Sequence, residues 1–266
     1  MISRIETMNK LLLNSLAGAA MVASSVASAS MVITWDYTVS SDWTGANFSA
    51  GNGDQVQNAS EISWGATGGD HNDSGAAAAD SRSALVITDS PFTSTVDTNM
   101  GNAQSSTLTH YNNAISANYA TLIDATLETS LTLTPNTPAG LALPTFTTDF
   151  VIAFEETTNT APCGFDVDTV CDDIFTIELG DLIQSFEYDG FIYTVSIGSA
   201  GLGPMDAATC AVVDKDPGCV GFTTPEGQAT PANFFFNITA QEIPEPASIA
   251  VLGMGLLMLG ARRFRK

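Results

Sequence analysis

Basic residues are scarce in this 266-residue sequence, which has 8 Lys and Arg against 29 Asp and Glu. Between residues 30 and 243 the only cations are Arg82 and Lys215, against 27 acids, so this segment has a net charge of −25. A surface of that sign repels nucleic acid and anionic lipid headgroups, which excludes nucleic acid as a partner. The charge favours solubility outside the cell, and it could also attract divalent cations.

Helical periodicity is also missing, since no stretch of 30–243 keeps a 3.6-residue repeat over ten residues. The chain contains no G-x-S-x-G nucleophile elbow, and neither His71 nor His110 has partners at a spacing typical of a catalytic triad. The sequence therefore predicts no catalytic residues and no enzyme activity.

The segment does contain a clear two-residue alternation of apolar and polar side chains. From Ile123 to Thr134 the odd positions are mostly apolar and the even positions polar, and Asp189-Gly190 is a two-residue hairpin signal. Strands with one apolar face pair antiparallel and pack face to face. We therefore expect 30–241 to be an all-β, antiparallel β-sandwich, jelly-roll-like, with acidic loops. Strands are predicted at 31–39, 62–64, 83–88, 123–134, 146–154, 175–179, 191–197 and 234–238, and loops at 40–60, 65–80 and 135–144.

The first 29 residues have the pattern of a signal peptide. Arg4 and Lys10 precede an apolar, alanine-rich run at 11–26, and Ala27-Ser28-Ala29 is a small-residue cleavage site. We expect signal peptidase to cut after Ala29 and the mature chain to leave the cytosol.

The last 25 residues, 242–266, combine three signals. Pro244-Glu245-Pro246 is stiff and extended, because each proline fixes its own φ and restricts the preceding residue. An apolar run at 247–261 would span about 22 Å as a helix, short of the roughly 30 Å hydrocarbon core, and the terminal Arg and Lys side chains can extend that reach. The run predicts a single transmembrane helix of the inner membrane. The cations at the end should stay cytoplasmic; they are Arg262, Arg263, Arg265 and Lys266. An ordinary anchor or a core helix is the alternative.

This ending closely resembles the PEP-CTERM sorting signal of exported bacterial surface proteins. The resemblance implies cleavage near Pro244-Glu245-Pro246 by an exosortase, a membrane-embedded protease. It also implies an association with exopolysaccharide production. Thr109-His110-Tyr111-Asn112 matches T-H-x-N, so the chain resembles the THxN proteins of that group, whose activity is not established.

An oxidising compartment favours disulfides among the four cysteines, which are Cys163, Cys171, Cys210 and Cys219. The short spacings favour Cys163–Cys171 and Cys210–Cys219, whereas a crossed pairing would clamp two loops together. Zinc is not expected, because the spacings exceed two to four residues.

Acidic residues near these cysteines are candidate calcium ligands, because Ca²⁺ prefers oxygen donors. They are Asp166 and Asp168 near the first pair, with Asp172 and Asp173, and Asp214 and Asp216 inside the second. A solvated acidic loop is the alternative. The loop at Asp70-His71-Asn72 begins like an EF-hand but lacks the acid at its twelfth position, so an ordinary turn is expected there.

His110 is the more interesting histidine. A structural role is expected, in which its ring and the neighbouring Asn side chains hold a corner where a strand meets a loop, by hydrogen-bonding to backbone groups. Trp43, in a presumed loop, is the aromatic best placed to stack on a sugar, with Tyr119 as a second choice, whereas Trp35 and Trp64 are expected in the core.

These features predict an exported cell-surface or extracellular-matrix protein, single-pass and membrane-anchored before processing, and non-enzymatic. A glycan-binding module, with or without calcium, is the first alternative, and extracellular polysaccharide would be its partner. A secreted hydrolase using two carboxylates is the second. No cofactor is predicted, and calcium is the one ion that the acidic loops could take.

Overall fold

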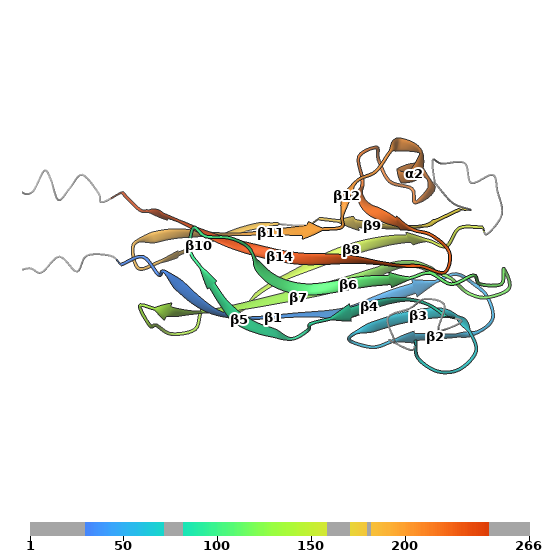
Figure 1. Ribbon diagram of the computed structural model, residues 1–266, viewed down its shortest axis with the longest axis horizontal. Coiled ribbons are helices and arrows are strands. Elements are labelled where there is room, and N and C mark those ends of the chain that lie inside the picture. The colour runs from blue at the N-terminus through green and yellow to red at the C-terminus, as the bar shows by residue number, and fades with distance from the viewer. Residues whose placement is uncertain (1–29, 72–81, 159–170, 180–181, 245–266) are drawn as a thin grey trace, which may run out of the picture. The chain divides into compact units, whose positions relative to one another are not determined.

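The computed structural model describes residues 30–71, 82–158, 171–179 and 182–244 (Figure 1). From Met31 on, the described chain belongs to one unit built from two seven-stranded antiparallel sheets, both strongly curled. The predicted all-β class is thus confirmed. Within these ranges no helix has the length and apolar character needed to cross a membrane. The predicted signal peptide, with Ala29, lies outside the described residues, and so does the tail from Glu245 onward.

The first sheet has the strand order β12-β13-β9-β8-β7-β1-β5. Its long central pair is β1 against β7, and α2 (Ala207–Val212) connects β12 to β13 at the edge. Its strands are β1 (Thr34–Phe48), β5 (Phe92–Asp97), β7 (Leu122–Thr137), β8 (Phe146–Glu155), β9 (Asp173–Glu178), β12 (Gly203–Pro204) and β13 (Val220–Thr224).

The second sheet has the order β10-β11-β14-β6-β4-β3-β2. Its longest strand, β14, pairs with β11 along one half and with β6 along the other. Its strands are β2 (Asp54–Gln57), β3 (Glu61–Ala66), β4 (Ser83–Thr88), β6 (Ala103–Tyr111), β10 (Ile183–Tyr188), β11 (Phe191–Ala200) and β14 (Ala229–Glu242).

The inward faces of both sheets share an apolar core that has two clusters. One contains Trp64 with Phe150 and Phe175, and the other contains Trp35 with Tyr193. Trp35 and Trp64 are fully buried, as the sequence predicted for them. Edge-to-face contacts of Trp35 with Tyr193, at 5.0 Å between ring centroids, stabilise the second cluster beyond area burial alone.

The loop predicted at 40–60 is wrong, because β1 runs on to Phe48 and β2 follows it. Ser41 occupies an inward position of β1 and interrupts the apolar alternation there. Its hydroxyl lies 2.9 Å from that of Ser106 and 3.0 Å from that of Thr129, so a buried hydroxyl network replaces apolar packing. Trp43 is consequently a core residue, 4% exposed, and the expectation that it stacks on sugars is wrong. Tyr119 is half-buried.

Smaller deviations occur at strand ends. Ile123 is 48% exposed while Leu122 is buried, because the β1–β7 register shifts between Asn47 and Phe48. Leu179 lies beyond the end of β9 and is 38% exposed. β7 extends into the loop predicted at 135–144. The sequence patterns also miss six strands of weak alternation, which are β2, β5, β6, β10, β12 and β13.

The Asp189-Gly190 hairpin is confirmed. Tyr188 pairs with Phe191, and the two turn residues have φ of +44° and +78°. Both values suit a tight hairpin turn that glycine and aspartate tolerate.

The predicted Cys210–Cys219 disulfide is also confirmed, and it joins α2 to the residue before β13. The bond excludes the crossed pairing and indicates an oxidising compartment. Cys171 is disulfide-bonded too, whereas Cys163 lies outside the described residues.

Candidate metal centre

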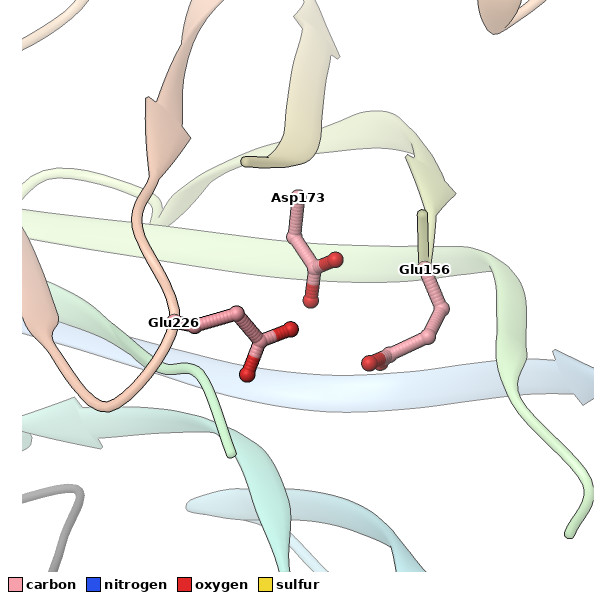
Figure 2. A group of neighbouring side chains, drawn as sticks. All are labelled: Glu156, Asp173 and Glu226. Carbon is pink, nitrogen blue, oxygen red and sulfur yellow. The ribbon is translucent and has the colours of Figure 1, made fainter. Parts of the chain in front are cut away.

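Three acids distant in the sequence meet at one end of the two sheets, and we call them the acidic cluster (Figure 2). Glu156 follows the end of β8, Asp173 begins β9, and Glu226 lies in the turn between β13 and β14. One carboxylate oxygen from each lies within 4.8 Å of the others. In the described part of the chain, no other group of three such side chains comes this close.

Strand pairing explains why the acids meet. β8 and β9 are antiparallel neighbours, so the end of one lies beside the start of the other. The turn carrying Glu226 is held by a hydrogen bond from Gln228 N to Pro225 O, 3.1 Å long, and Gly227 adopts φ +70° in it. β13 pairs with β9, which brings this turn beside Asp173.

Several oxygens of the acidic cluster are buried without a hydrogen bond. Glu156 Oε2 accepts from Trp64 Nε1 at 2.8 Å, and Asp173 Oδ1 accepts from the backbone N of Thr157 at 2.9 Å. Glu156 Oε1, Asp173 Oδ2 and both Glu226 oxygens have no such partner. A buried polar atom without a partner costs about 1–3 kcal/mol, and more when charged. The cluster therefore needs protons or a cation.

His110 of the T-H-x-N motif lies beside the cluster and is completely buried. Its ring is parallel to that of Trp64, with centroids 6.2 Å apart, and edge-on to Phe154 at 5.0 Å. Its Nε2 lies 3.8 Å from Asp173 Oδ2, which is too long for a hydrogen bond, and neither ring nitrogen has a partner.

Asn112 of the same motif links the two sheets. It follows β6 in the second sheet, and its Nδ2 donates to Thr224 O of β13 in the first, at 2.7 Å. Its backbone N donates to Gln228 O, and its backbone O accepts from Gly227 N, so it also supports the Glu226 turn. Asn112 is fully buried, and its Oδ1 has no hydrogen-bond partner.

Thr109, the first residue of the motif, is half-buried and points away from His110, since successive strand residues alternate in direction. The motif lies at a strand-to-loop corner as expected, because β6 ends at Tyr111, and the side chains of Asn112 and Asn113 donate to backbone oxygens of Thr224 and Arg82. The expectation that the His110 ring also bonds to backbone groups is wrong, because neither ring nitrogen has a partner and the ring packs against aromatic side chains instead.

Burial is the largest cause of the shifted pKa values of His110 and the three acids. It raises the pKa of Glu156 to about 8, an effect that the Trp64 hydrogen bond opposes and the Glu226 charge reinforces. Burial, followed by the charge of Glu156, raises the pKa of Asp173 well above its usual range. Burial and the charge of Asp172 raise the pKa of Glu226. Burial lowers the pKa of His110 to about 3, so its ring is neutral near pH 7.

No described basic side chain neutralises the cluster. The two cations of 30–243 are engaged elsewhere: Lys215 Nζ pairs with Glu178 at 2.6 Å, and Arg82 donates to Ser63 and to backbone oxygens near it. All charge effects on the three acids come from other acids. Glu156 and Asp173 are close enough to share a proton, which is the state that an ion-free cluster would adopt near neutral pH.

Of the acids predicted as calcium ligands, Asp173 lies in the acidic cluster and Asp172 precedes it, buried, with one carboxylate oxygen accepting from Thr223 Oγ1 at 3.2 Å. The others do not join the cluster. Asp214 and Asp216 are exposed in the disulfide loop, and Asp166 and Asp168 lie outside the described residues. The EF-hand-like loop falls mostly outside them as well; His71 is buried, and its backbone N donates to Glu61 Oε1 at 2.8 Å.

Sequence reasoning noticed Asp173 among the cysteine-associated acids but missed Glu156 and Glu226. Among 27 acids in 30–243, nothing local distinguishes Glu156 from Glu155, or the Pro225-Glu226-Gly227 turn from any other turn. The useful signal would have been His110 and Asn112, which identify the strand end where these acids meet.

A scan of protein-family models and a search of curated proteins found no match to this chain.

Proposed function

We propose that this chain is an exported, non-enzymatic protein of the cell surface or extracellular matrix. Its C-terminal segment would serve as a PEP-CTERM-like signal for membrane insertion and exosortase processing, and the domain would be a β-sandwich of jelly-roll-like connectivity. The Cys210–Cys219 disulfide supports the export step, because such bonds persist in oxidising compartments.

The observation that carries this proposal is where β14 ends. The strand runs 14 residues from Ala229 to Glu242, which is about 45 Å, and delivers an exposed Pro244 at the end of the unit where β1 begins (Figure 1). Hydrogen bonds from Thr98 N to Ile33 O and from Asn99 N to Ile238 O hold the two chain ends together there. The proposed processing motif therefore begins at an exposed residue, away from the acidic cluster.

The buried position of His110 supports a non-enzymatic role. Its ring packs against both Trp64 and Phe154 and is 0% exposed, so a polymer substrate has no access to it. Glu156 and Asp173 are similarly enclosed, and a glycosidase needs carboxyls that reach the sugar.

The glycan-binding alternative loses the side chain on which it depended, because Trp43 is in the core. A surface cleft of about 310 Å³ lies beside the disulfide loop, lined by Thr176–Glu178 and Lys215–Val220. None of its lining residues is aromatic, whereas sugar rings are usually held against aromatic faces. We therefore keep the non-enzymatic surface role as the conclusion.

Fractionation with intact-mass measurement tests the proposal. In native cells we expect a chain beginning at Ser30, cut near Pro244-Glu245-Pro246 and recovered from the surface or matrix. A Glu245→Ala variant should begin at Ser30 but keep its C-terminal segment and stay in the membrane fraction, whereas Glu242→Ala, which changes an exposed acid just before the motif, should be processed normally. Recovery of the uncut, reduced chain in the cytosol would exclude the proposal.

A further inference from the structure

We propose that the acidic cluster binds one divalent cation, Ca²⁺, which joins the ends of the two sheets. Glu156, Asp173 and Glu226 would supply carboxylate oxygens, and the Asn112 amide oxygen would complete the inner set from the second sheet. Each step of this inference follows from contacts described above, and it does not depend on export.

The side chains of the three acids already point toward one another, and four of their carboxylate oxygens have no hydrogen-bond partner (Figure 2). Glu156 Oε1, Asp173 Oδ2 and the two Glu226 oxygens are unpaired and buried, and Asn112 Oδ1 is an independent, uncharged oxygen in the same condition. Asn112 is held by its Nδ2 bond to Thr224 O, so its oxygen cannot rotate away without breaking that bond. Three acids alone would be ambiguous, but Asn112 also hydrogen-bonds through its backbone to both residues that follow Glu226, Gly227 and Gln228, and its amide oxygen is buried without a partner.

A further donor lies on β13. Thr224 is the register partner of Asp173, so the two side chains stand side by side on the same face of the sheet. Thr224 is 0% exposed, and its Oγ1 has no hydrogen-bond partner. Counting it, the site offers five residues with oxygen donors.

This donor set favours calcium. Ca²⁺ takes six to eight oxygens in flexible geometry, whereas Mg²⁺ needs a strict octahedron and retains several waters. Zn²⁺ prefers nitrogen and sulfur, and among the described residues the nitrogen ligand found beside the acids is the His110 ring, 3.8 Å from Asp173 Oδ2. A calcium ion also compensates three carboxylates that no described cation neutralises.

The ion would act as a clamp between the sheets. In the first sheet, Glu156 follows the end of β8 and Asp173 is the first residue of β9. Asn112 follows the end of β6 in the second sheet. Glu226 lies in the connection that leads from one sheet to the other. Binding to the folded form alone stabilises that form by mass action.

Thermal unfolding of the full-length chain, purified in detergent and stripped with EDTA, tests the inference at pH 8. With CaCl₂ at about a hundred times its Kd, we expect the Tm to rise by about 5–10 °C. Elemental analysis after dialysis should find one calcium per chain.

Glu226→Gln is the decisive variant. The substitution removes one ligand charge, and it also removes repulsion between Glu226 and the other acids of the cluster. Without calcium, the Tm of the variant should therefore equal or exceed that of the parent. Such a Tm would show that the variant folds. Its calcium-dependent rise should be lost. Asp216→Asn, an exposed acid of the disulfide loop, should keep the full rise.

Three results would overturn the inference: no Tm change with calcium in the parent chain, an undiminished rise in Glu226→Gln, or a larger rise with Mg²⁺ or Zn²⁺ than with Ca²⁺. The first would leave a proton-sharing acid cluster, and the last would reassign the ion.

Discussion

Asn112 links three separate parts of this molecule by hydrogen bonds. Through one side chain and two backbone bonds it joins the end of β6 to β13 and to the Glu226 turn. His110, two residues earlier, packs against Trp64 and Phe154, which also contact each other. The T-H-x-N residues thus form a corner of the chain that holds β13 and the Glu226 turn in place.

Asn112→Ala should destabilise the ion-free protein by about 1–3 kcal/mol, because Thr224 O loses its donor in a buried site. Urea unfolding in EDTA measures the effect. Thr109→Ala, a half-buried residue of the same motif without a side-chain hydrogen bond across the corner, should cost less than about 1 kcal/mol. Equal losses in both variants would contradict this role for Asn112.

Glu156 predicts a pH dependence of the ion-free protein. Its folded pKa of about 8 lies above its ordinary value of 4.5, so folding binds a proton between these values and stability falls as pH rises through that window. His110 acts oppositely between about 3 and 6.5, because its folded pKa is lowered. Above pH 6.5 only the acid effect remains, together with Asp173 and Glu226, whose pKa values are also raised.

From pH 6.5 to 8 we therefore expect the free energy of unfolding to fall by up to about 2 kcal/mol. Urea unfolding across this range in EDTA measures it, and Glu156→Gln should flatten the curve. A parent whose stability rises with pH over the same range would refute the assignment.

At the scale of elements, the short helix α2 depends on its surroundings. It has only six residues, too few to be stable alone, and Asp206 caps it by accepting from Ala208 N and Thr209 N. The Cys210–Cys219 bond then ties it to β13, the strand that leads to Glu226.

Replacing both cysteines, Cys210→Ser with Cys219→Ser, should destabilise the fold by about 2–3 kcal/mol. The bond closes a loop with a sequence separation of 9, and loop-closure entropy of the unfolded chain sets that magnitude. Urea midpoints of oxidised parent and double variant give the difference, with Asp216→Asn in the same loop as an unaffected control. A difference below about 0.5 kcal/mol would show that the disulfide does not stabilise the fold.

Elements also show where local patterns succeed and fail. Phe234, Phe236 and Ile238 alternate strictly and are buried in β14 as predicted. β1 is concealed because Ser41 stands at an inward position, where hydroxyl contacts to Ser106 and Thr129 replace apolar ones. A pattern method reads a polar residue as outward and so ends the strand early.

For the whole molecule, charge of one sign is the dominant long-range property. With 29 acids against 8 basic residues, compaction brings like charges together. This repulsion is general, unlike the concentrated repulsion inside the acidic cluster.

Raising NaCl from 0.01 to 0.15 M should increase the Tm of the EDTA-treated chain by about 2–4 °C, because the Debye length falls from about 30 to 8 Å. Glu226→Gln should respond like the parent, since screening does not require that ligand. A response to NaCl lost in Glu226→Gln would mean that sodium occupies the cluster, contrary to this expectation.

The β class and the Asp189-Gly190 turn could be predicted from the sequence, and the Cys210–Cys219 bond was the favoured of the pairings left open, because alternation, turn chemistry and short spacing are local properties. The burial of Trp43 in the core and the meeting of Glu156, Asp173 and Glu226 could not be predicted in this way and follow from the packed fold. These acids lie 17 and 53 residues apart, and no nearby residue marks them. Their meeting depends on which strands pair and in which register, a choice made by packing the whole chain.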